Sequence, residues 1–540
     1  MPETGKLNLD DALSLAVIAI LALPMLGAVI CALVRNARDA RWISLITSVL
    51  CFLLTIPLLA NFKWHSPQPL ANQFYSALGQ IESIGFNLHI GVDGISIWLL
   101  ALTTFLMPLA IAASFASIRE RPKEYYAWML ALQAAMVGVF LARDGLLFYI
   151  FFELTLVPMF FIIGIWGGPQ RRYAAGKFFL FTFTGSLFTL AAIIYLGLKT
   201  GEFDINAMVD HARSSLMSDK ERFWLLLGFL AGFAVKVPLF PLHTWLPLAH
   251  TEAPTSGSVI LAGVLLKLGT YGILRFALPV GFGTVPTVVQ IVGIVCLVGI
   301  IYGALVAWVQ QDIKKLVAYS SVSHLGFCVL GLAALNVEGV SGSILYMINH
   351  GLSTGALFLV VGMIYDRYHT RDINELSGLA RKMPVLAFFF ILFTLSSIGL
   401  PGLNGFVSEF LTILGAFKSP HLGVGYGVLA ALGIILGAVY MLHMAARVIW
   451  GPLKTPGGDQ HGHEPAAHEA DSGETLPVDL NRREVAILAP IALAVVVLGV
   501  LPNLVLKTLE APVRQLIVGA EGEQQQQGIS KPQLATAGER

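Results

Sequence analysis

The chain has 540 residues, of which 56% are hydrophobic and 12% are charged, and its mean hydropathy is +0.75. Soluble domains carry about 25% charged residues, so a soluble fold of this length would expose too much apolar surface to water, and we expect the surplus to face lipid. The net charge of +1 argues against nucleic acid or another polyanion as a partner.

Apolar runs long enough to cross a membrane recur along the whole sequence. A spanning helix needs about 20 mostly apolar residues, and roughly fourteen runs meet that need. The predicted helices cover 13–34, 42–61, 92–117, 125–142, 145–166, 177–198, 223–247, 256–279, 285–309, 317–335, 342–365, 385–414, 424–449 and 485–507. The residues before the first run lack the basic stretch and cleavage pattern of a signal peptide, so we expect this run to remain as a membrane helix.

Lysines and arginines concentrate in the loops that follow odd-numbered helices. Arg35, Arg38 and Arg41 follow the first helix, and Lys314 and Lys315 follow the ninth. Because basic loops stay on the cytoplasmic side of a membrane, these loops are predicted to be cytoplasmic. Both termini are then predicted on the outer, periplasmic side of a cell inner, energy-coupling membrane.

The predicted fold is an all-α polytopic membrane protein with two inverted repeats of five helices. Its predicted parts are helices 1–3 at 1–124, a first repeat of helices 4–8 at 125–280, a second repeat of helices 9–13 at 281–450, a polar cytoplasmic loop at 451–483, the last transmembrane helix at 484–518 and a disordered tail at 519–540. The polar loop contains His461, His463 and His468, which we interpret as solvated side chains, with a metal site as the alternative.

Six titratable side chains lie inside otherwise apolar predicted helices, each in a different helix. They are Glu153, Lys236, Lys267, His324, His350 and Glu409. A charge at the centre of a membrane helix costs about 3 kcal/mol on insertion scales, and such residues usually face a cavity or a partner. A series of these groups is what a proton relay requires. The alternatives are structural ion pairs for the Glu and Lys residues and hydrogen-bonded core side chains for the histidines.

The chemistry of these groups suits proton exchange. Burial favours the neutral forms of Glu and Lys, whereas pairing restores their charged forms, so an opposed Glu153–Lys236 pair would act as a switch that holds or releases the Lys proton. Neutral His donates on one side and accepts on the other, which suits His324 and His350 as connectors. His243 lies closer to a helix end, where a structural role is the simpler interpretation; the same holds for His443.

Two predicted helices contain breaks beside a charged residue. Pro238, Pro241 and Pro247 follow Lys236, and Gly399, Pro401, Gly402 and Gly405 precede Glu409. Proline removes a backbone hydrogen bond, and the freed carbonyl groups need polar surroundings at membrane depth. Broken helices in corresponding halves are typical of transporters built from inverted repeats. The two breaks lie five helices apart, which predicts repeats of helices 4–8 and 9–13.

Motifs for redox or nucleotide chemistry do not occur in the sequence. Cys31, Cys51, Cys296 and Cys328 all lie in apolar runs and form no CxxC pair, so disulfide, zinc and iron–sulfur interpretations are poor. Neither a dinucleotide-binding GxGxxG after a strand nor a Walker A motif is present. We therefore expect no cofactor in this chain.

Three stretches resemble the antiporter-like subunits of complex I, a family shared with multi-subunit cation/proton antiporters and membrane-bound hydrogenases. The stretches are GVDGISIWLL, KVPLFPLHTWLPLAHTEAPTSGSVILAGVLLKLGTYGILR and QQDIKKLVAYSSVSHLGF, and the resemblance covers 90–500. In this family the second broken helix usually carries a Lys. This sequence has Glu409 instead, which is the pattern of one of the subunit types.

The resemblance implies a role for each of the six buried residues. It implies a Glu–Lys pair at Glu153 and Lys236, a central lysine at Lys267, polar positions on a connecting axis at His324 and His350, and a terminal proton site at Glu409. It also implies an input half-channel from the cytoplasm in helices 4–8 and an exit half-channel to the outside in helices 9–13.

The activity implied by the resemblance is that of a subunit of an H⁺-transporting NADH:quinone oxidoreductase, with no redox centre in this chain. Flavin, iron–sulfur clusters and quinone are expected in partner subunits. The implied partners are the neighbouring antiporter-like subunits L and N, the small subunit K and lipids. The alternatives are a subunit of a multi-subunit cation/proton antiporter, a membrane-bound hydrogenase subunit, and a non-catalytic scaffold.

Overall fold

The computed structural model describes residues 8–64, 66, 68, 70–282, 285–456 and 478–521. The three loop histidines and the tail beyond residue 521 lie outside the described residues. The elements are α1 (Leu9–Leu33), α2 (Ala37–Asn61), β1 (Gln73–Ile81), η1 (Glu82–Ile84), β2 (Phe86–Val92), α3 (Ser96–Ser117), α4 (Pro122–Leu141), α5 (Gly145–Leu154), α6 (Leu156–Trp166), α7 (Arg171–Thr200), α8 (Ile205–Arg213), α9 (Asp219–Lys236), α10 (Leu246–Glu252), α11 (Thr255–Ile260), η2 (Leu261–Leu265), α12 (Leu266–Gly272), η3 (Ile273–Phe282), α13 (Pro286–Trp308), α14 (Ile313–Ala333), α15 (Val337–Tyr368), η4 (Leu379–Arg381), α16 (Pro384–Ile398), α17 (Asn404–Lys418), α18 (Val424–Ile449), α19 (Arg482–Val500) and α20 (Asn503–Glu521).

The prediction of a polytopic helical membrane protein is confirmed. Within the described ranges, twelve helices are long and apolar enough to cross a membrane. Two of the fourteen predicted spans are absent from these twelve, and both are broken helices. The first break separates α9 from α10, and the second separates α16 from α17. The breaks therefore lie at the proline and glycine positions that the sequence predicts.

The region before and at the start of the third helix differs from the prediction in two ways. A two-stranded antiparallel hairpin of β1 and β2 occupies residues before the third helix, so the fold is not purely helical. The third helix begins at Ser96, not at 92, because the Asp93 carboxylate accepts the backbone N–H groups of Ile95 and Ser96. This contact caps the helix and ends the extended segment.

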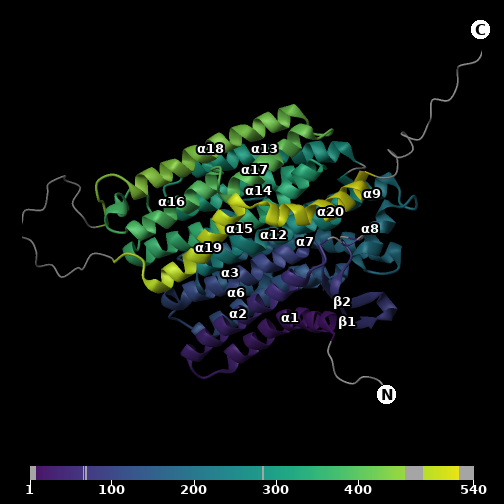
Figure 1. Ribbon diagram of the computed structural model, residues 1–540, viewed down its shortest axis with the longest axis horizontal. Coiled ribbons are helices and arrows are strands. Elements are labelled where there is room, and N and C mark those ends of the chain that lie inside the picture. The colour runs from purple at the N-terminus through teal and green to yellow at the C-terminus, as the bar shows by residue number, and fades with distance from the viewer. Residues whose placement is uncertain are drawn as a thin grey trace, which may run out of the picture.

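The predicted single last helix at 484–518 is wrong. The chain forms two helices, α19 and α20, which are separated at Leu501 and Pro502. Proline disfavours the helical conformation in the residue before it, and Leu501 adopts φ −123° and ψ 54°. Helix α20 buries Val505, Leu509 and Val513 on one face and packs against α15 and η3 (Figure 1). An amphipathic stripe of this kind is typical of a helix that lies on other helices.

Matching backbone contacts support the predicted repeat. Gly145 N–H donates to Phe203 O and Ile205 N–H to Arg143 O; in the second half, Ile313 N–H donates to Arg371 O and Ile373 N–H to Gln311 O. Every member of the second set follows its counterpart by the same number of positions. An aspartate caps the helix in both cases, since Asp144 accepts from the first turn of α5 and Asp312 from that of α14.

The two sets of contacts lie at opposite ends of the molecule. The first adjoins α8, at the right of Figure 1, whereas the second lies between α15 and α16, toward the left. The matching ends thus point in opposite directions, as an inverted repeat requires.

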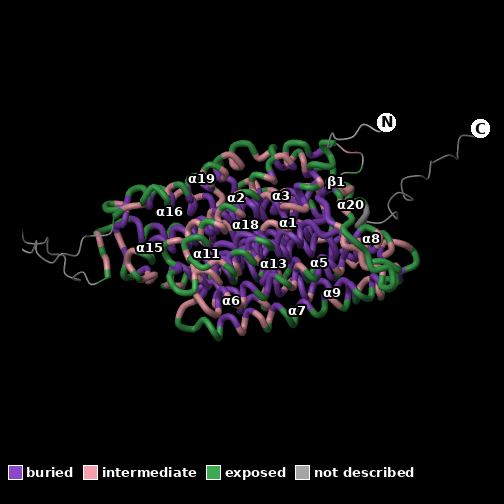
Figure 2. Tube along the Cα trace, turned by 90° about the horizontal axis from the view of Figure 1, so that it is seen from below, coloured by how far each residue is buried: buried purple, intermediate pink, exposed green. Residues whose placement is uncertain are grey.

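The most buried helices occupy the middle of the bundle. The segment Thr255–Phe282 and helices α14 and α15 are almost entirely buried, whereas α1, α2, α7, α18 and α19 are apolar but largely exposed. Figure 2 shows buried residues concentrated through the interior, with exposed residues along the outer helices and at both ends. Exposed apolar helices of this kind are expected to face lipid.

Candidate functional site

Four of the six predicted residues come together in the buried centre of the bundle. Lys267 comes from α12, His324 from α14, His350 from α15 and Glu409 from α17. All four are buried. They form a line of neighbouring polar groups that runs from the first half of the chain into the second.

Lys267 begins this line. Its Nζ lies 2.7 Å from His350 Nδ1 and also donates to the backbone carbonyl of Ala262. Ala262 lies in η2, a π-helical turn directly before α12. Because π-helical turns in membrane and soluble helices frequently mark functional sites, the irregular backbone next to Lys267 is consistent with a functional position. His350 Nε2 has no hydrogen-bond partner among the described residues.

The histidines lead to Glu409. The rings of His350 and His324 lie 5.8 Å apart between centroids. His324 Nδ1 lies 2.7 Å from the Tyr346 hydroxyl, which donates to Glu409 Oε1 over 2.8 Å. The direct distance from His324 Nδ1 to Glu409 Oε1 is 3.5 Å. Tyr346 therefore bridges the last histidine and the final carboxylate.

The broken helix shapes the surroundings of Glu409. Gly399, in the break between α16 and α17, has φ +80°, and a Cβ there would collide with the Glu409 carboxylate. Glycine tolerates this conformation and leaves room for the carboxylate. A small cavity next to it is lined by His324, Tyr346, Asn349, His350, Ser353 and Glu409. The interrupted helix thus provides a polar pocket at the end of the line.

Lys236 and Glu153 lie apart from this line. Lys236 Nζ donates to Thr155 Oγ1 over 3.2 Å and lies 4.9 Å from the centre of the Phe152 ring. Both carboxylate oxygens of Glu153 are buried without a hydrogen-bond partner in the described part of the chain, so the carboxylate does not bond Lys236. In this conformation the direct Glu153–Lys236 contact is therefore open, meaning that no hydrogen bond joins the two side chains. Lys236 is bonded instead to Thr155, two residues after Glu153.

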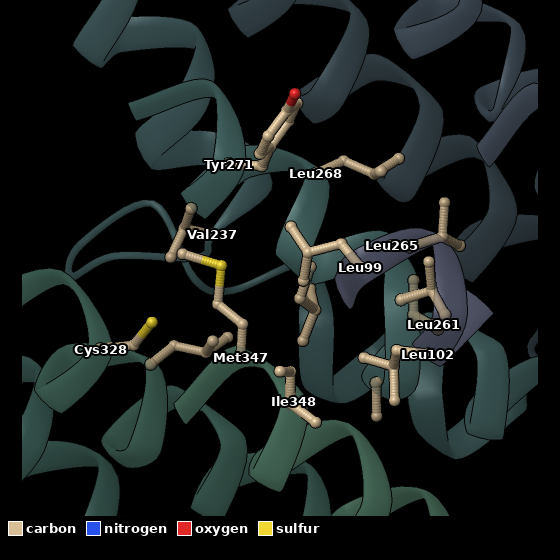
Figure 3. Close-up of a cluster of buried hydrophobic side chains, with 14 of the residues drawn as sticks. Leu99, Leu102, Val237, Leu261, Leu265, Leu268, Tyr271, Cys328, Met347 and Ile348 are labelled. Atoms are coloured by element: carbon tan, nitrogen blue, oxygen red, sulfur yellow. The ribbon is translucent and has the colours of Figure 1, made fainter. Parts of the chain in front are cut away.

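The helices that carry Lys236 and Lys267 pack against each other beside buried apolar side chains. The two helices are in contact, since a Cβ on Gly269 would lie 3.0 Å from the Lys236 Cβ. Figure 3 shows the buried cluster around this place, including Val237, Leu268 and Met347. Buried polar groups in such surroundings meet few hydrogen-bond partners.

Three groups of functional interest are not predicted from the sequence. His250, in α10, is fully buried, stacks on Phe358 with centroids 4.6 Å apart, and has no hydrogen-bond partner for either ring nitrogen among the described residues. Its position after the first helix break is the signal that points to it. Tyr346 is the second group, and an ordinary tyrosine within an apolar helix carries no distinguishing sequence signal.

The third group is a buried ion cluster. Asp93 Oδ2 accepts from Arg143 Nη1 over 2.5 Å and also pairs with Arg275. Arg143 lies between the predicted helices 125–142 and 145–166, yet it is buried and also donates to the Gly91 carbonyl. The cluster joins the hairpin, the start of α3 and the end of the Thr255–Phe282 segment. Buried charges of this kind require such pairing.

A helical membrane bundle with two broken helices and a buried line of titratable side chains defines the class of antiporter-like membrane subunits. Residues 142–437 match the family described as NADH:quinone oxidoreductase/Mrp antiporter, transmembrane, and residues 19–142 match that described as NADH-ubiquinone oxidoreductase chain 4, amino terminus. The NADH-quinone oxidoreductase subunit M of Rhodobacter capsulatus is 43% identical over 510 residues, which cover 92% of this chain and 95% of that protein. The chain belongs to the family of subunit M, or chain 4, of NADH–quinone oxidoreductase.

Solved structures share the fold. A chain of respiratory complex I from Thermus thermophilus with bound NADH has a TM-score of 0.79 and 30% identity, and the match covers 93% of this chain and 100% of that chain. A chain of the Mrp complex from Dietzia sp. DQ12-45-1b has a TM-score of 0.78 at 20% identity, covering 96% and 100%. The second likeness concerns the fold alone. The family resemblance predicted from the three sequence stretches is therefore confirmed, and the subunit type with Glu at the last site is subunit M.

Proposed function

We propose that this chain translocates protons as a membrane-arm subunit of NADH–quinone oxidoreductase. The observation that carries the proposal is the buried line from Lys267 through His350, His324 and Tyr346 to Glu409. Each side chain in this line is titratable or carries a hydroxyl group, and each is buried away from bulk water. Such a line is expensive to bury, which favours a functional role.

We propose that protons move from Lys267 toward Glu409. Lys267 as an ammonium donates to His350 Nδ1, so a proton passing along this contact leaves a neutral lysine and an imidazolium. The proton passes to His324 after rearrangement of the two rings. A proton then leaves His324 Nδ1 for the Tyr346 oxygen as the tyrosine passes its own proton to Glu409, so the tyrosine is unchanged and one proton is transferred.

Lys236 and Glu153 supply the proposed control. When the carboxylate approaches Lys236, the ammonium form is favoured; when it moves away, the lysine releases its proton toward Lys267. We propose that the open contact corresponds to the separated arrangement of the two groups. Each proton moved outward works against about 2.3 kcal/mol per 100 mV of membrane potential, and a change of one to two pKa units at a relay group is of about that size.

The driving chemistry is proposed to lie in partner subunits. NADH oxidation and quinone reduction there would use flavin and iron–sulfur clusters, while this chain contributes no redox centre. The neighbouring antiporter-like subunits L and N and the small subunit K are the proposed membrane partners. We place the chain in the cell inner membrane with both termini on the outer side, on the basis of the basic odd-numbered loops.

A multi-subunit cation/proton antiporter is the alternative function. The shared fold of the Mrp complex keeps it open, but the terminal Glu409 differs from the lysine usual in those subunits. Sodium-dependent transport that continues without NADH or quinone would favour the antiporter.

The test uses membrane vesicles that contain the assembled complex with Lys236→Ala. NADH-driven proton pumping and NADH oxidation are measured on the same vesicles, with Lys199→Ala as the control, because Lys199 is half-exposed and pairs with Glu221 on the surface. We expect Lys236→Ala to lose pumping and oxidation together and Lys199→Ala to retain both. Normal pumping by Lys236→Ala would overturn the proposed relay.

A further inference from the structure

A second buried lysine lies outside the line, at the start of α14. Lys314 is buried, and its Nζ donates to Ala253 O over 2.5 Å and to Thr251 O over 3.4 Å. The nearby aspartate does not pair with it: the side chain of Asp312 accepts the backbone N–H of Lys314 and pairs with Arg371. The Lys314 ammonium is therefore directed at backbone carbonyl groups of the first half of the chain.

The acceptors belong to the turn between α10 and α11. All three carbonyl groups of residues 251–253 are bound by groups from elsewhere in the fold. Thr251 O accepts from Arg371 over 3.0 Å as well as from Lys314, and Glu252 O accepts from Gly168 N–H over 2.9 Å. The Glu252 carboxylate also accepts from Gln170 N–H. The turn is thus hydrogen-bonded to two cations of the second half, Lys314 and Arg371, and to the backbone directly before α7.

This turn lies between the buried His250 and Lys267, the first group of the proposed proton path. His250 is two residues before Glu252, and the segment after the turn leads to Lys267. On the other side, Lys314 lies on the same helix as His324. Free carbonyl groups at the end of a helix attract cations, so the ammonium stabilises the C-terminal end of α10 and links its position to α14.

We propose that Lys314 is a positioning residue, whose ammonium ties the α10–α11 turn to α14 and so keeps His250 and Lys267 aligned with His324. The proposal rests on the proposed proton-translocating function. The ammonium connects the two halves of the chain through hydrogen bonds to backbone carbonyl groups, without a salt bridge to a carboxylate. A neutral side chain would leave the carbonyl groups of Thr251 and Ala253 without this donor, and Arg371, Gly168 and Gln170 would remain as the donors to the turn.

Lys315 provides a matched control for this role. It is the next residue, has the same side chain, and its backbone N–H donates to the same aspartate, yet the side chain is exposed. Removing its charge changes the local net charge as Lys314→Met does. A difference between the two variants therefore reports the contact with the turn and not the loss of one positive charge.

The experiment compares Lys314→Met, Lys314→Arg, Lys314→Gln and Lys315→Met in vesicles that contain the full complex. It measures assembled complex, NADH-driven pumping, NADH oxidation, and hydrogen–deuterium exchange of the 246–260 segment. We expect Lys314→Met to lower the pumping rate about tenfold, a size typical for loss of a hydrogen bond to a charged group, and to raise exchange in this segment. Lys314→Arg should restore both, and Lys315→Met should match the unmodified chain.

The outcomes separate this inference from the proposed function. If Lys267→Met in the same vesicles loses pumping while Lys314→Met behaves like Lys315→Met, the positioning role is wrong and the relay stands. If Lys267→Met pumps normally, the relay itself fails. If Lys314→Met does not assemble, rescue by Arg but not by Gln supports the cationic contact. Equal loss of assembly or pumping in all three Lys314 variants would overturn it.

Discussion

The Tyr346 hydroxyl donates to Glu409 Oε1 over 2.8 Å and lies 2.7 Å from His324 Nδ1. A tyrosine has a single hydroxyl proton, so when this proton points at an ionised Glu409 the His324 Nδ1–H must be the donor toward Tyr346. The bridge thereby defines the histidine tautomer as well as the last step of the path. Because Tyr346 contacts both His324 and Glu409, it can carry a proton from the histidine to the carboxylate.

The first prediction concerns this bridge. Tyr346→Phe keeps the ring but removes the hydroxyl, which leaves only the direct 3.5 Å separation between His324 and Glu409. Positioned proton transfer contributes about 10²–10⁴-fold to rates, and because the direct route remains we expect a fall at the lower end of that range. Pumping and NADH oxidation by vesicles are the measurements. Tyr319→Phe, in the same helix as His324 but outside the line, should leave both unchanged; unchanged pumping in Tyr346→Phe would exclude the bridge.

The second prediction concerns the terminal carboxylate. Glu409→Gln keeps the size of the side chain but cannot accept a proton from Tyr346, so pumping should fall by about two orders of magnitude or more, while Glu409→Asp should retain part of it. Glu338→Gln is the control, because Glu338 is a surface carboxylate that pairs with Lys418. Pumping is measured in vesicles with equal amounts of assembled complex. Equal pumping by the Gln variants of both residues would count against a proton site at Glu409.

The sequence predicts much of the line because each of its charged members interrupts an apolar run. Lys267, His324, His350 and Glu409 all stand out on this criterion, and the structure brings them together. Tyr346 does not stand out, since a tyrosine is compatible with a membrane helix. Its role depends on the orientation of two other side chains, which only the packing of α14, α15 and α17 determines.

Other features depend on contacts between residues that are distant in the sequence. The Asp93–Arg143–Arg275 cluster combines residues from three separate parts of the chain, and hydropathy gives no sign that they meet. The separation of Glu153 from Lys236 depends on side-chain packing around Thr155, which a sequence pattern does not describe. The helix break at Leu501 was missed because the apolar run continues across Pro502.

The third prediction concerns the glycine beside Glu409. Gly399→Ala places a side chain at φ +80° and also brings a Cβ against the Glu409 carboxylate. Gly402→Ala is a matched control, since Gly402 has φ +93° and a Cβ there would meet nothing within 4 Å. Backbone strain of about 1–2 kcal/mol is common to both variants, so the extra loss in Gly399→Ala measures the collision. The temperature at which NADH oxidation is irreversibly lost should be lower for Gly399→Ala; equal temperatures would show that the carboxylate moves aside freely.

The fourth prediction concerns the buried ion cluster near the hairpin. Asp93→Asn removes the carboxylate that pairs with Arg143 and Arg275, both of which are buried. Leaving buried charges without their partner costs about 3–5 kcal/mol, and Asp93 also caps α3. We therefore expect little assembled complex in membranes that carry Asp93→Asn. Asp10→Asn is the control, because Asp10 is exposed and pairs with Lys63 on the surface, where an ion pair contributes about 0–1 kcal/mol. Abundance of the assembled complex, measured in native gels of solubilised membranes, distinguishes the two, and normal abundance of Asp93→Asn would mean that the two arginines find other acceptors.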